Sequence, residues 1–521
     1  MKKLFIFCML LLSSTFFCHA QELGLKTKLG PIFKDSRKNT RLSKVLEAAN
    51  GEIIVVRAYY GGMLGRSAKG YFIECYNAQL ELKREYDYNF EEVHKDSEDP
   101  TLDFLMDGNT LHIIELLYDK TSESYVFSAN SGDLTTFKFQ RKEILKLPYK
   151  KPKKGGLFSM SGSSGFGARL FLNDDKSAFL ITIDIDQEKN MESHQFYLFD
   201  KSLNLKLEHT FERDIKERDY KVSQFEISND GTTLYALGRF FTPESKSKEV
   251  GGKYGYELSR ISAKGAVSNI FDSKDKYAAS LKTVLIDDKL ICVGFYSEKK
   301  DNRYKGICYY DIDPTTLKIK AEKFNPFSEQ FMIDKYGKVK DKELRSLAFR
   351  GITTTENKEI IFNAEEDYST SQTTFNANGG SRTITSYHKD DIICVKLNTA
   401  GNLEWSRNIN KSEASFDFKD PYASYTSLTT SNNTYFFINS GEKVKKLSND
   451  RIKFVQSSRG RANLNAIRIN QHGDFDYQEI IDDKDGEIPF MVSNGYTTKN
   501  AIYFLGAEDK KKRLLKITLA E

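Results

Sequence analysis

Short polar turn signals recur along the chain, and each is followed by a run of β-branched and aromatic residues. Pairs such as Asn50-Gly51, Asp107-Gly108 and Asp230-Gly231 supply the positive φ that tight hairpins require. Eight such signals occur, and consecutive signals are 56 to 75 residues apart. The others are centred on residues 174, 288, 357, 432 and 500. A spacing of this kind indicates one repeated supersecondary unit.

Each turn signal introduces two strand patterns, which are separated by a variable loop. The first patterns occupy residues 53–60, 111–117, 178–183, 234–240, 290–295, 360–364, 435–438 and 502–505. The second patterns occupy residues 71–76, 125–129, 195–199, 257–261, 307–312, 392–397, 465–469 and 514–519. A helical period of 3.6 residues is not sustained anywhere after residue 20. With a further strand on either side, each repeat predicts four antiparallel strands.

Repeats of this kind predict an all-β fold, a β-propeller in which each repeat is one blade. A single blade cannot bury both of its faces, so blades stack around a common axis. Eight repeats predict eight four-stranded blades. The last repeat ends after its third strand, so we expect residues 23–33 to supply its fourth strand and close the ring. Seven blades, or two packed all-β domains, are the alternatives that the spacing leaves open.

Two repeats resemble those of known propellers. Residues 227–235, with Ser228, Asp230, Gly231 and Leu234, resemble the S-x-D-G-x-x-L-x-F repeat of TolB-like propellers. Residues 397–405 resemble the repeat of quinoprotein-like propellers. Both resemblances imply the propeller architecture and no specific family. Quinoprotein dehydrogenases carry a tryptophan motif in most blades, and this chain has a single Trp, so their activity is not implied.

The first 20 residues predict a secretory signal peptide. Lys2 and Lys3 precede an apolar run over residues 4–17, and Ala20 ends a site suited to cleavage. The run is shorter than the roughly 20 residues that a membrane-spanning helix needs. A lipoprotein acylated on Cys18 is the alternative, although Phe17 stands where a small residue is preferred. We therefore expect an exported protein, in the periplasm, at the outer membrane or outside the cell, with residues 21–521 forming a single propeller domain.

Composition and charge narrow the range of partners. The chain has 521 residues, of which 39% are hydrophobic and 29% charged, as in globular proteins with a large core. Its net charge of +5 falls to +3 when Lys2 and Lys3 leave with the signal peptide. This near-neutral balance indicates neither a nucleic acid nor a membrane surface as partner. After residue 20, no segment of the sequence is apolar enough to span a membrane.

The connections predicted on one face of the ring are long. They cover residues 61–70, 89–99, 141–167, 242–254, 325–345, 365–390, 411–421 and 441–461. Long loops on a rigid scaffold commonly carry function, so we expect binding on this long-loop face. Two of these loops are strongly cationic and suit an anionic partner, although solvated linkers explain the same charges. Their candidate binding residues are Lys150, Lys151, Lys153, Lys154, Arg459 and Arg461.

The sequence contains little that indicates catalysis or a cofactor. No H-E-x-x-H, P-loop or G-x-S-x-G motif is present, so we expect no catalytic residue, metal or cofactor. Residues 482–487 are acidic and suit calcium, but their spacing does not match an EF-hand. Cys292 and Cys308 lie on adjacent predicted strands, symmetric about residue 300. In an oxidising compartment they are the candidate disulfide, with two buried thiols as the alternative.

The sequence therefore favours an exported, non-catalytic binding module over an enzyme. Its partner would be a protein or a glycan of the cell envelope, bound on the long-loop face. One alternative is a carbohydrate-active enzyme, a glycoside hydrolase or lyase, with carboxylates near the ring axis. Another is a structural or sensor domain whose ligand enters the central channel.

Overall fold

The computed structural model of the chain consists almost entirely of β-strands. It describes residues 23–37, 39–61, 67–93, 99–149, 166–185, 191–241, 254–271, 276–298, 303–339, 344, 346–375, 380–458, 461–498 and 501–519. The predicted signal peptide and the candidate residues Lys150, Lys151, Lys153, Lys154 and Arg459 lie outside these ranges.

The described strands form nine sheets, and eight of these each contain four antiparallel strands in spatial sequence. Sheet 1 contains β3 (Thr40–Glu47), β4 (Ile53–Gly61), β5 (Ser67–Tyr76) and β6 (Leu82–Asn89), and sheet 2 contains β7 (Thr101–Asp107), β8 (Thr110–Asp119), β9 (Ser124–Asp133) and β10 (Lys138–Pro148). Sheet 3 contains β11 (Phe166–Leu172), β12 (Ala178–Ile185), β13 (Met191–Asp200) and β14 (Leu205–Lys216), and sheet 4 contains β15 (Tyr220–Ile227), β16 (Thr233–Phe240), β17 (Gly255–Ser262) and β18 (Gly265–Phe271).

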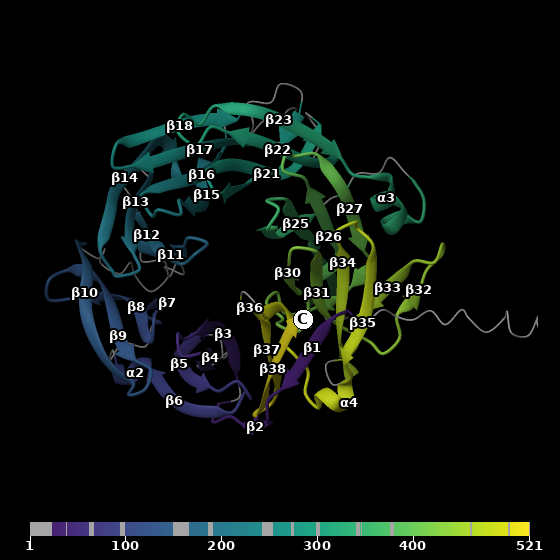
Figure 1. Cartoon of the computed structure of the whole chain (residues 1–521), viewed down its shortest axis with the longest axis horizontal. Helices are drawn as coiled ribbons and strands as arrows, with labels where there is room; N and C mark the ends of the chain where they lie inside the picture. Colours follow the sequence, from purple (N-terminus) through teal and green to yellow (C-terminus); the bar gives the residue numbers. More distant parts are fainter. Residues whose placement is uncertain are drawn as a thin grey trace, which may run out of the picture.

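Sheets 5 to 8 follow the same plan. Sheet 5 contains β19 (Lys276–Ala278) with β20 (Lys282–Ile286), β21 (Lys289–Glu298), β22 (Gly306–Ile312) and β23 (Ile319–Pro326), and sheet 6 contains β24 (Leu347–Thr354), β25 (Ile360–Phe375), β26 (Ser381–Leu397) and β27 (Leu403–Ile409). Sheet 7 contains β30 (Thr426–Thr429), β31 (Asn433–Ser440), β34 (Asn463–Asn470) and β35 (Phe475–Ile481), and sheet 8 contains β36 (Tyr496–Thr497), β37 (Ala501–Glu508), β38 (Lys511–Leu519) and β1 (Leu25–Leu29). Figure 1 shows the sheets around a common centre in chain order. The all-β propeller architecture predicted from the sequence is therefore confirmed.

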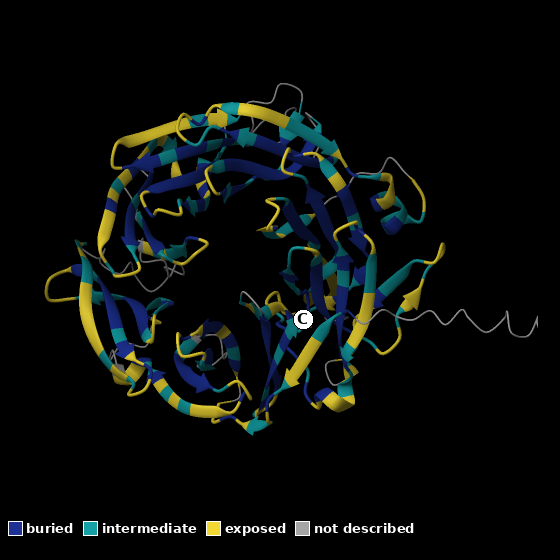
Figure 2. Ribbon diagram, in the orientation of Figure 1, coloured by how far each residue is buried: buried dark blue, intermediate teal, exposed yellow. Residues whose placement is uncertain are grey.

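Apolar clusters fill the spaces between neighbouring sheets. The second strand of a sheet is buried on both faces, so its sequence is a continuous apolar run rather than an alternation, as in β4. Figure 2 shows the same gradient, with buried middle strands and exposed outer strands. Each cluster contains residues from two neighbouring sheets. From sheets 1 and 2 onward, the clusters include Ile54 with Ile113, Phe127 with Ile181, Leu198 with Leu234, Leu237 with Leu290, Val293 with Phe362, Ile392 with Phe436, Phe437 with Phe504 and, between sheets 8 and 1, Tyr503 with Val55.

Sheet 8 combines strands from the two ends of the sequence. β1 pairs antiparallel with β38, with Leu25 opposite Leu519 and Leu29 opposite Leu515. The short strand β2 (Phe33–Lys34) pairs with the start of β38. Leu23 is buried in the cluster between sheets 7 and 8. In Figure 1, the purple strand β1 lies beside the yellow strand β38.

A buried ion cluster then ties the segment after β2 to sheet 1. Arg57 on β4 donates from Nη1 to Asp35 Oδ2 at 2.5 Å and from Nε to Glu74 Oε2 at 2.9 Å. Thr40 Oγ1 donates to the same Asp35 oxygen at 3.0 Å. The rings of Phe33 and Phe72 lie 5.1 and 5.0 Å from the guanidinium. Because Arg57 is 1% exposed, its charge depends on these two carboxylates.

Several segments expected to be loops contain regular structure. Residues 367–375 and 381–389 extend β25 and β26 as a two-stranded ribbon, in which Ser371 pairs with Thr385 and Thr373 with Thr383 through hydroxyl contacts of 2.9 Å. Because these residues are polar, the hydrophobic pattern of the sequence does not predict that the two strands continue to pair. Residues 141–148, expected to begin a loop, belong to the outer strand β10.

Two further connections carry short elements. The connection after β23 contains the helix α3 (Glu329–Tyr336). Ser328 caps its first turn, and Gly337 ends it at φ +77°, a conformation that glycine adopts without strain. The connection between β31 and β34 contains β32 (Lys445–Lys446) and β33 (Ile452–Val455).

The Arg57 cluster gives a first testable prediction. Arg57→Met leaves Asp35 and Glu74 buried without their counter-ion, so we expect the free energy of unfolding to fall by about 3–5 kcal/mol. Lys83→Met in the same sheet breaks an exposed pair with Glu81 and should cost at most about 1 kcal/mol. Urea unfolding followed by circular dichroism measures both. Equal losses for the two variants would contradict the role assigned to Arg57.

Candidate functional site

A cavity of about 560 Å³ lies where the first strands of several sheets begin. Arg41 near the start of β3, Arg350 in β24 and Thr426 at the start of β30 line it together. These strands follow the connections between sheets, so the cavity opens on the long-loop face. We call it the long-loop cavity. Its charged and aromatic lining residues are Arg41, Arg350, Asp367, Lys389, Lys419, Asp420, Phe418 and Tyr425.

Phe418 gives the long-loop cavity an exposed aromatic wall. It lies in the connection between β27 and β30 and is 57% exposed, while Phe416 beside it is 77% exposed. The Tyr387 ring contacts Phe418 edge-on with centroids 5.4 Å apart, and Lys389 Nζ lies 5.4 Å from the Phe418 centroid. Tyr387 and Lys389 therefore orient Phe418 while much of its ring stays open to solvent.

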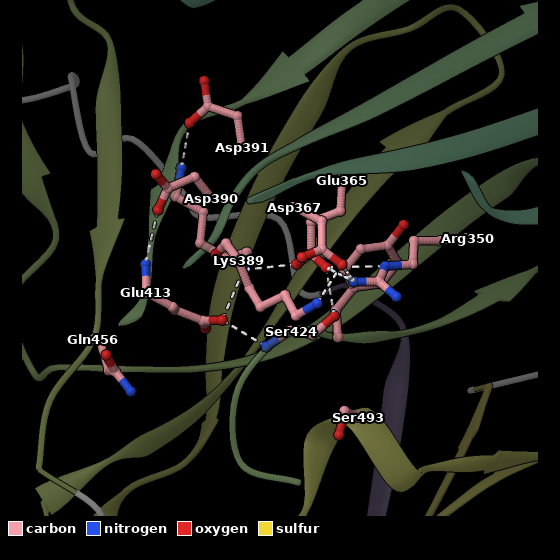
Figure 3. Close-up of polar contacts among 12 residues, drawn as sticks. Arg350, Glu365, Asp367, Lys389, Asp390, Asp391, Glu413, Ser424, Gln456 and Ser493 are labelled. Carbon is pink, nitrogen blue, oxygen red and sulfur yellow. Dashed lines mark hydrogen bonds and ion pairs between the residues drawn. The ribbon is translucent and has the colours of Figure 1, made fainter. Parts of the chain in front are cut away.

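Lys389, which contacts Phe418, also adjoins a network of buried charges, and Figure 3 shows the polar contacts of this network. Lys411 Nζ lies 2.9 Å from Glu365 Oε1 and 2.8 Å from Glu413 Oε2, and it donates to the Lys389 carbonyl at 2.6 Å. Lys411, Glu365 and Glu413 are each at most 3% exposed. Lys411 is the first residue of the short strand β28 (Lys411–Ser412), in the connection that follows β27. Its ammonium group thus joins this connection to β26.

The network also fixes two residues that line the cavity. Glu365 Oε2 accepts from Arg350 Nη2 and from Ser424 Oγ, both at 2.7 Å. The Ser424 amide donates to Glu413 Oε2 at 2.5 Å. Glu365 and Glu413 do not line the cavity themselves, and Lys411 holds both. The geometry therefore favours positioning, rather than catalysis, as the role of these carboxylates.

The two carboxylates of the network differ in their affinity for protons. Burial raises the pKa of Glu413 to about 7, because Lys411 only partly offsets the loss of solvent. Burial also opposes ionisation of Glu365, but the charges of Lys411 and Arg350 outweigh it and lower that pKa. Glu413 Oε1 has no hydrogen-bond partner among the described residues. Glu413 is therefore the group of this network that takes up a proton near neutral pH.

Among the residues that the sequence nominated for binding, Arg461 is described, and it does not line this cavity. Arg461 is exposed, and its amide donates to the Ser458 carbonyl at 2.9 Å. The other five nominated residues lie outside the described ranges, so their role stays a prediction. The analysis of the sequence missed Arg41, Arg350 and Phe418. The sequence did contain a signal for Phe416 and Phe418, because they are two aromatic residues within an otherwise polar connection.

Cys292 and Cys308 are free thiols in the structure, which corresponds to the alternative of two buried thiols. Cys292 is opposite Tyr310, and Cys308 is opposite Gly294. The hairpin is symmetric about residue 301 rather than 300, and a shift of one residue in the axis moves each partner by two positions. Burial raises the pKa of both thiols far above its ordinary value.

The acidic run over residues 482–487 serves a local role. Asp482 Oδ1 accepts from the Asp485 amide at 2.6 Å and caps the short helix α4 (Asp483–Gly486). Within the described ranges, no three His, Cys, Asp or Glu side chains are grouped so as to hold a metal. Calcium binding there remains a prediction. A search of the same ranges for a helix long and apolar enough to cross a membrane also found none.

Comparisons with known proteins found similarity in structure and none in sequence. No protein-family model matches it, and no curated protein matches it in sequence. Its structural neighbours are β-propeller proteins. The polysaccharide lyase Uly1 is 12% identical over 81% of this chain and 90% of its own, with a TM-score of 0.36. The propeller domain of the Trilobed protease from Pyrococcus furiosus is 12% identical over 75% and 99%, with a TM-score of 0.33. Sqt1 from Chaetomium thermophilum, bound to the N-terminus of ribosomal protein L10, is 10% identical over 92% and 98%, with a TM-score of 0.37.

The raised pKa of Glu413 predicts a pH-dependent stability. Between its ordinary value of 4.5 and about 7, the folded protein holds a proton that the unfolded chain has released. The contribution of Glu413 to the free energy of unfolding is therefore present below this window and is lost as pH rises through it, with a slope of at most about 1.4 kcal/mol per pH unit. Glu413→Gln should remove this slope, as measured by urea unfolding at several pH values.

An exposed acid provides the control for this measurement. Glu322→Gln on β23 should keep the slope of the unaltered protein. Burial also raises the pKa of Glu226, to about 8, so Glu226 adds its own slope to that of Glu413. The quantity to compare is therefore the difference in slope between each variant and the unaltered protein. Identical slopes for Glu413→Gln and the unaltered protein would show that Glu413 does not titrate in this range.

The cysteines give a further prediction. Cys75, Cys292, Cys308 and Cys394 are free and buried. We expect all four to be alkylated after denaturation without reductant, and none to react rapidly in the folded protein, since burial disfavours the thiolate. Mass spectrometry counts the adducts. Two adducts in place of four would instead support a disulfide between Cys292 and Cys308.

Proposed function

We propose that the protein is an exported, non-catalytic binding module of the cell envelope, built as an eight-bladed propeller that β1 closes. Its partner binds on the long-loop face, at the long-loop cavity and the exposed rings of Phe416 and Phe418. The observation that carries this proposal is the combination of an exposed aromatic ring, Phe418, and a buried charge network that fixes both ends of the connection carrying it. Rigid support of an exposed apolar group is typical of recognition surfaces.

The eight-bladed, closed form is supported by the pairing of β1 with β38 and by the apolar cluster between sheets 8 and 1. Without β1, the outer edge of β38 presents unpaired backbone groups, which favour aggregation. Export is supported by the predicted signal peptide over residues 1–20. A binding role is supported by the engagement of Glu365 and Glu413 with Lys411, which leaves these carboxylates away from the cavity wall.

Capture from the native envelope tests the binding role. The tagged protein is incubated with solubilised envelope material, and bound protein and carbohydrate are both analysed. Phe416→Ala/Phe418→Ala should abolish retention of the partner, because it removes the exposed aromatic surface without touching the core. Val267→Ala/Ile270→Ala on the outer strand β18 is the matched control, since these side chains are 46% and 55% exposed. A separate variant tests the cationic segment. It carries neutral residues in place of Lys150, Lys151, Lys153 and Lys154.

Two results would count against the proposed binding role. A partner that is retained equally by both double variants does not bind at the aromatic wall. Retention of nothing by the unaltered protein, under conditions where it is folded, would remove the envelope partner altogether.

Removal of β1 tests the closed form. A chain that starts at Asp35 should unfold at a lower temperature and aggregate, since β38 loses its pairing partner. A peptide spanning residues 21–34, added in excess, should restore the melting temperature in part. A chain that starts at Leu23 is the control and should melt as the full mature protein does. An unchanged melting temperature for the chain starting at Asp35 would contradict closure by β1.

A further inference from the structure

We propose that the long-loop cavity binds a carboxylated sugar unit of an anionic glycan. This inference rests on the proposed function, because it assigns a ligand class to the same site. The ligand's carboxylate would meet Arg41 and Lys419, and its ring would lie against Phe418. The argument has three parts: the charge of the wall, the open aromatic face and the neutral polar groups around it.

The wall of the cavity carries an excess of positive charge. Four cationic residues and two acidic residues line it. Asp367 is already engaged, since Arg350 Nη2 lies 3.1 Å from it and Lys389 is also in contact. Among the described residues, Arg41 and Lys419 have no acidic partner for their side chains. The guanidinium of Arg41 lies only over the Tyr60 ring, at 5.6 Å, so its hydrogen-bond donors remain available to an anion.

Asp420, the second acidic residue, is held by its own loop. Its carboxylate accepts from Ser415 Oγ at 2.8 Å and from the Tyr422 amide at 3.0 Å. These contacts stabilise the turn that carries Phe418 and Lys419. With the negative charge of Asp420 still counted, the four cations and two acids of the wall leave a net charge of +2, which favours a carboxylate over a neutral sugar.

Phe418 supplies a flat surface beside these cations. Its ring is 57% exposed and is oriented by Tyr387 and Lys389. The face of an aromatic ring carries partial negative charge, which attracts the weakly positive C–H groups on one side of a pyranose. A peptide with acidic side chains has the same charge but no comparable flat C–H surface.

Neutral polar residues complete the lining. Ser427 on β30 and Ser493 and Asn494 in the turn before β36 line the cavity. Ser493 Oγ donates to Asn494 Oδ1 at 3.2 Å, which orients the Asn494 amide and leaves its Nδ2 group without a described acceptor. Hydroxyl and amide groups of this kind match the hydroxyl groups of a sugar. The volume of about 560 Å³ falls within the range of small-ligand sites.

Binding of defined oligosaccharides tests the inference. The mature protein is titrated calorimetrically with a galacturonate trisaccharide, a glucuronate trisaccharide, a neutral galactose trisaccharide and a glutamate tripeptide. We expect at least one uronate to bind, with the neutral sugar and the peptide at least about tenfold weaker. Arg41→Gln and Phe418→Ala should each weaken uronate binding by about tenfold or more. Lys264→Gln, in the exposed turn between β17 and β18, is the control and should leave the affinity unchanged.

The outcomes separate this inference from the proposed function. Equal affinity for the neutral sugar, equal affinity for the glutamate peptide, or unaltered uronate binding by Arg41→Gln and Phe418→Ala would overturn the inference. Failure of both uronates to bind at millimolar concentration would also overturn it. If the uronates fail while Phe416→Ala/Phe418→Ala still abolishes capture of an envelope partner, the inference falls and the proposed function stands. If capture fails as well, both fall.

Discussion

The pairing of β1 with β38 is the contact that joins the two ends of the described chain in one sheet. Residues 25–29 and 515–519 are at opposite ends of the sequence, yet they are adjacent strands of one sheet. The other sheets are each built from one continuous stretch of chain and need no such long-range partner. Sheet 8 is therefore the only sheet of the described chain whose completion requires both ends. The Arg57 cluster extends this junction, because Asp35 follows β2 directly and is bonded to sheet 1.

Two fully buried cations, Arg57 and Lys411, use the same physical arrangement at different places. Each lies between two carboxylates, Arg57 between Asp35 and Glu74, and Lys411 between Glu365 and Glu413. A buried pair of this kind adds little net stability, because desolvation of the charges offsets their attraction. What it supplies is position, since an alternative arrangement leaves a charge unpaired. Arg57 fixes the segment after β2, and Lys411 fixes the connection that carries Phe418.

The sequence predicted the fold better than the site, for physical reasons. Strands buried on both faces leave continuous apolar runs, so residues 53–60 and 290–295 were placed within β4 and β21. The ribbon of β25 and β26 was missed because its Ser and Thr residues pair across strands without an apolar pattern.

The site was missed for a different reason. Arg41, Arg350 and Phe418 come from three sheets or connections, and only the ring geometry brings them to one cavity. The spacing of Cys292 and Cys308 placed the hairpin axis one residue away from its position in the structure, because spacing alone does not determine register.

The placement of β1 also governs the order in which the chain completes its structure. During synthesis at about 5–20 residues per second, β1 emerges roughly 25 to 100 s before β38. Sheets 1 to 7 have all their strands available before that moment, whereas β1 has no partner until the last residues emerge. The nascent protein thus passes through a stage with an unpaired strand at its beginning and an incomplete sheet at its end. A chaperone that binds extended segments would find its target in these unpaired strands.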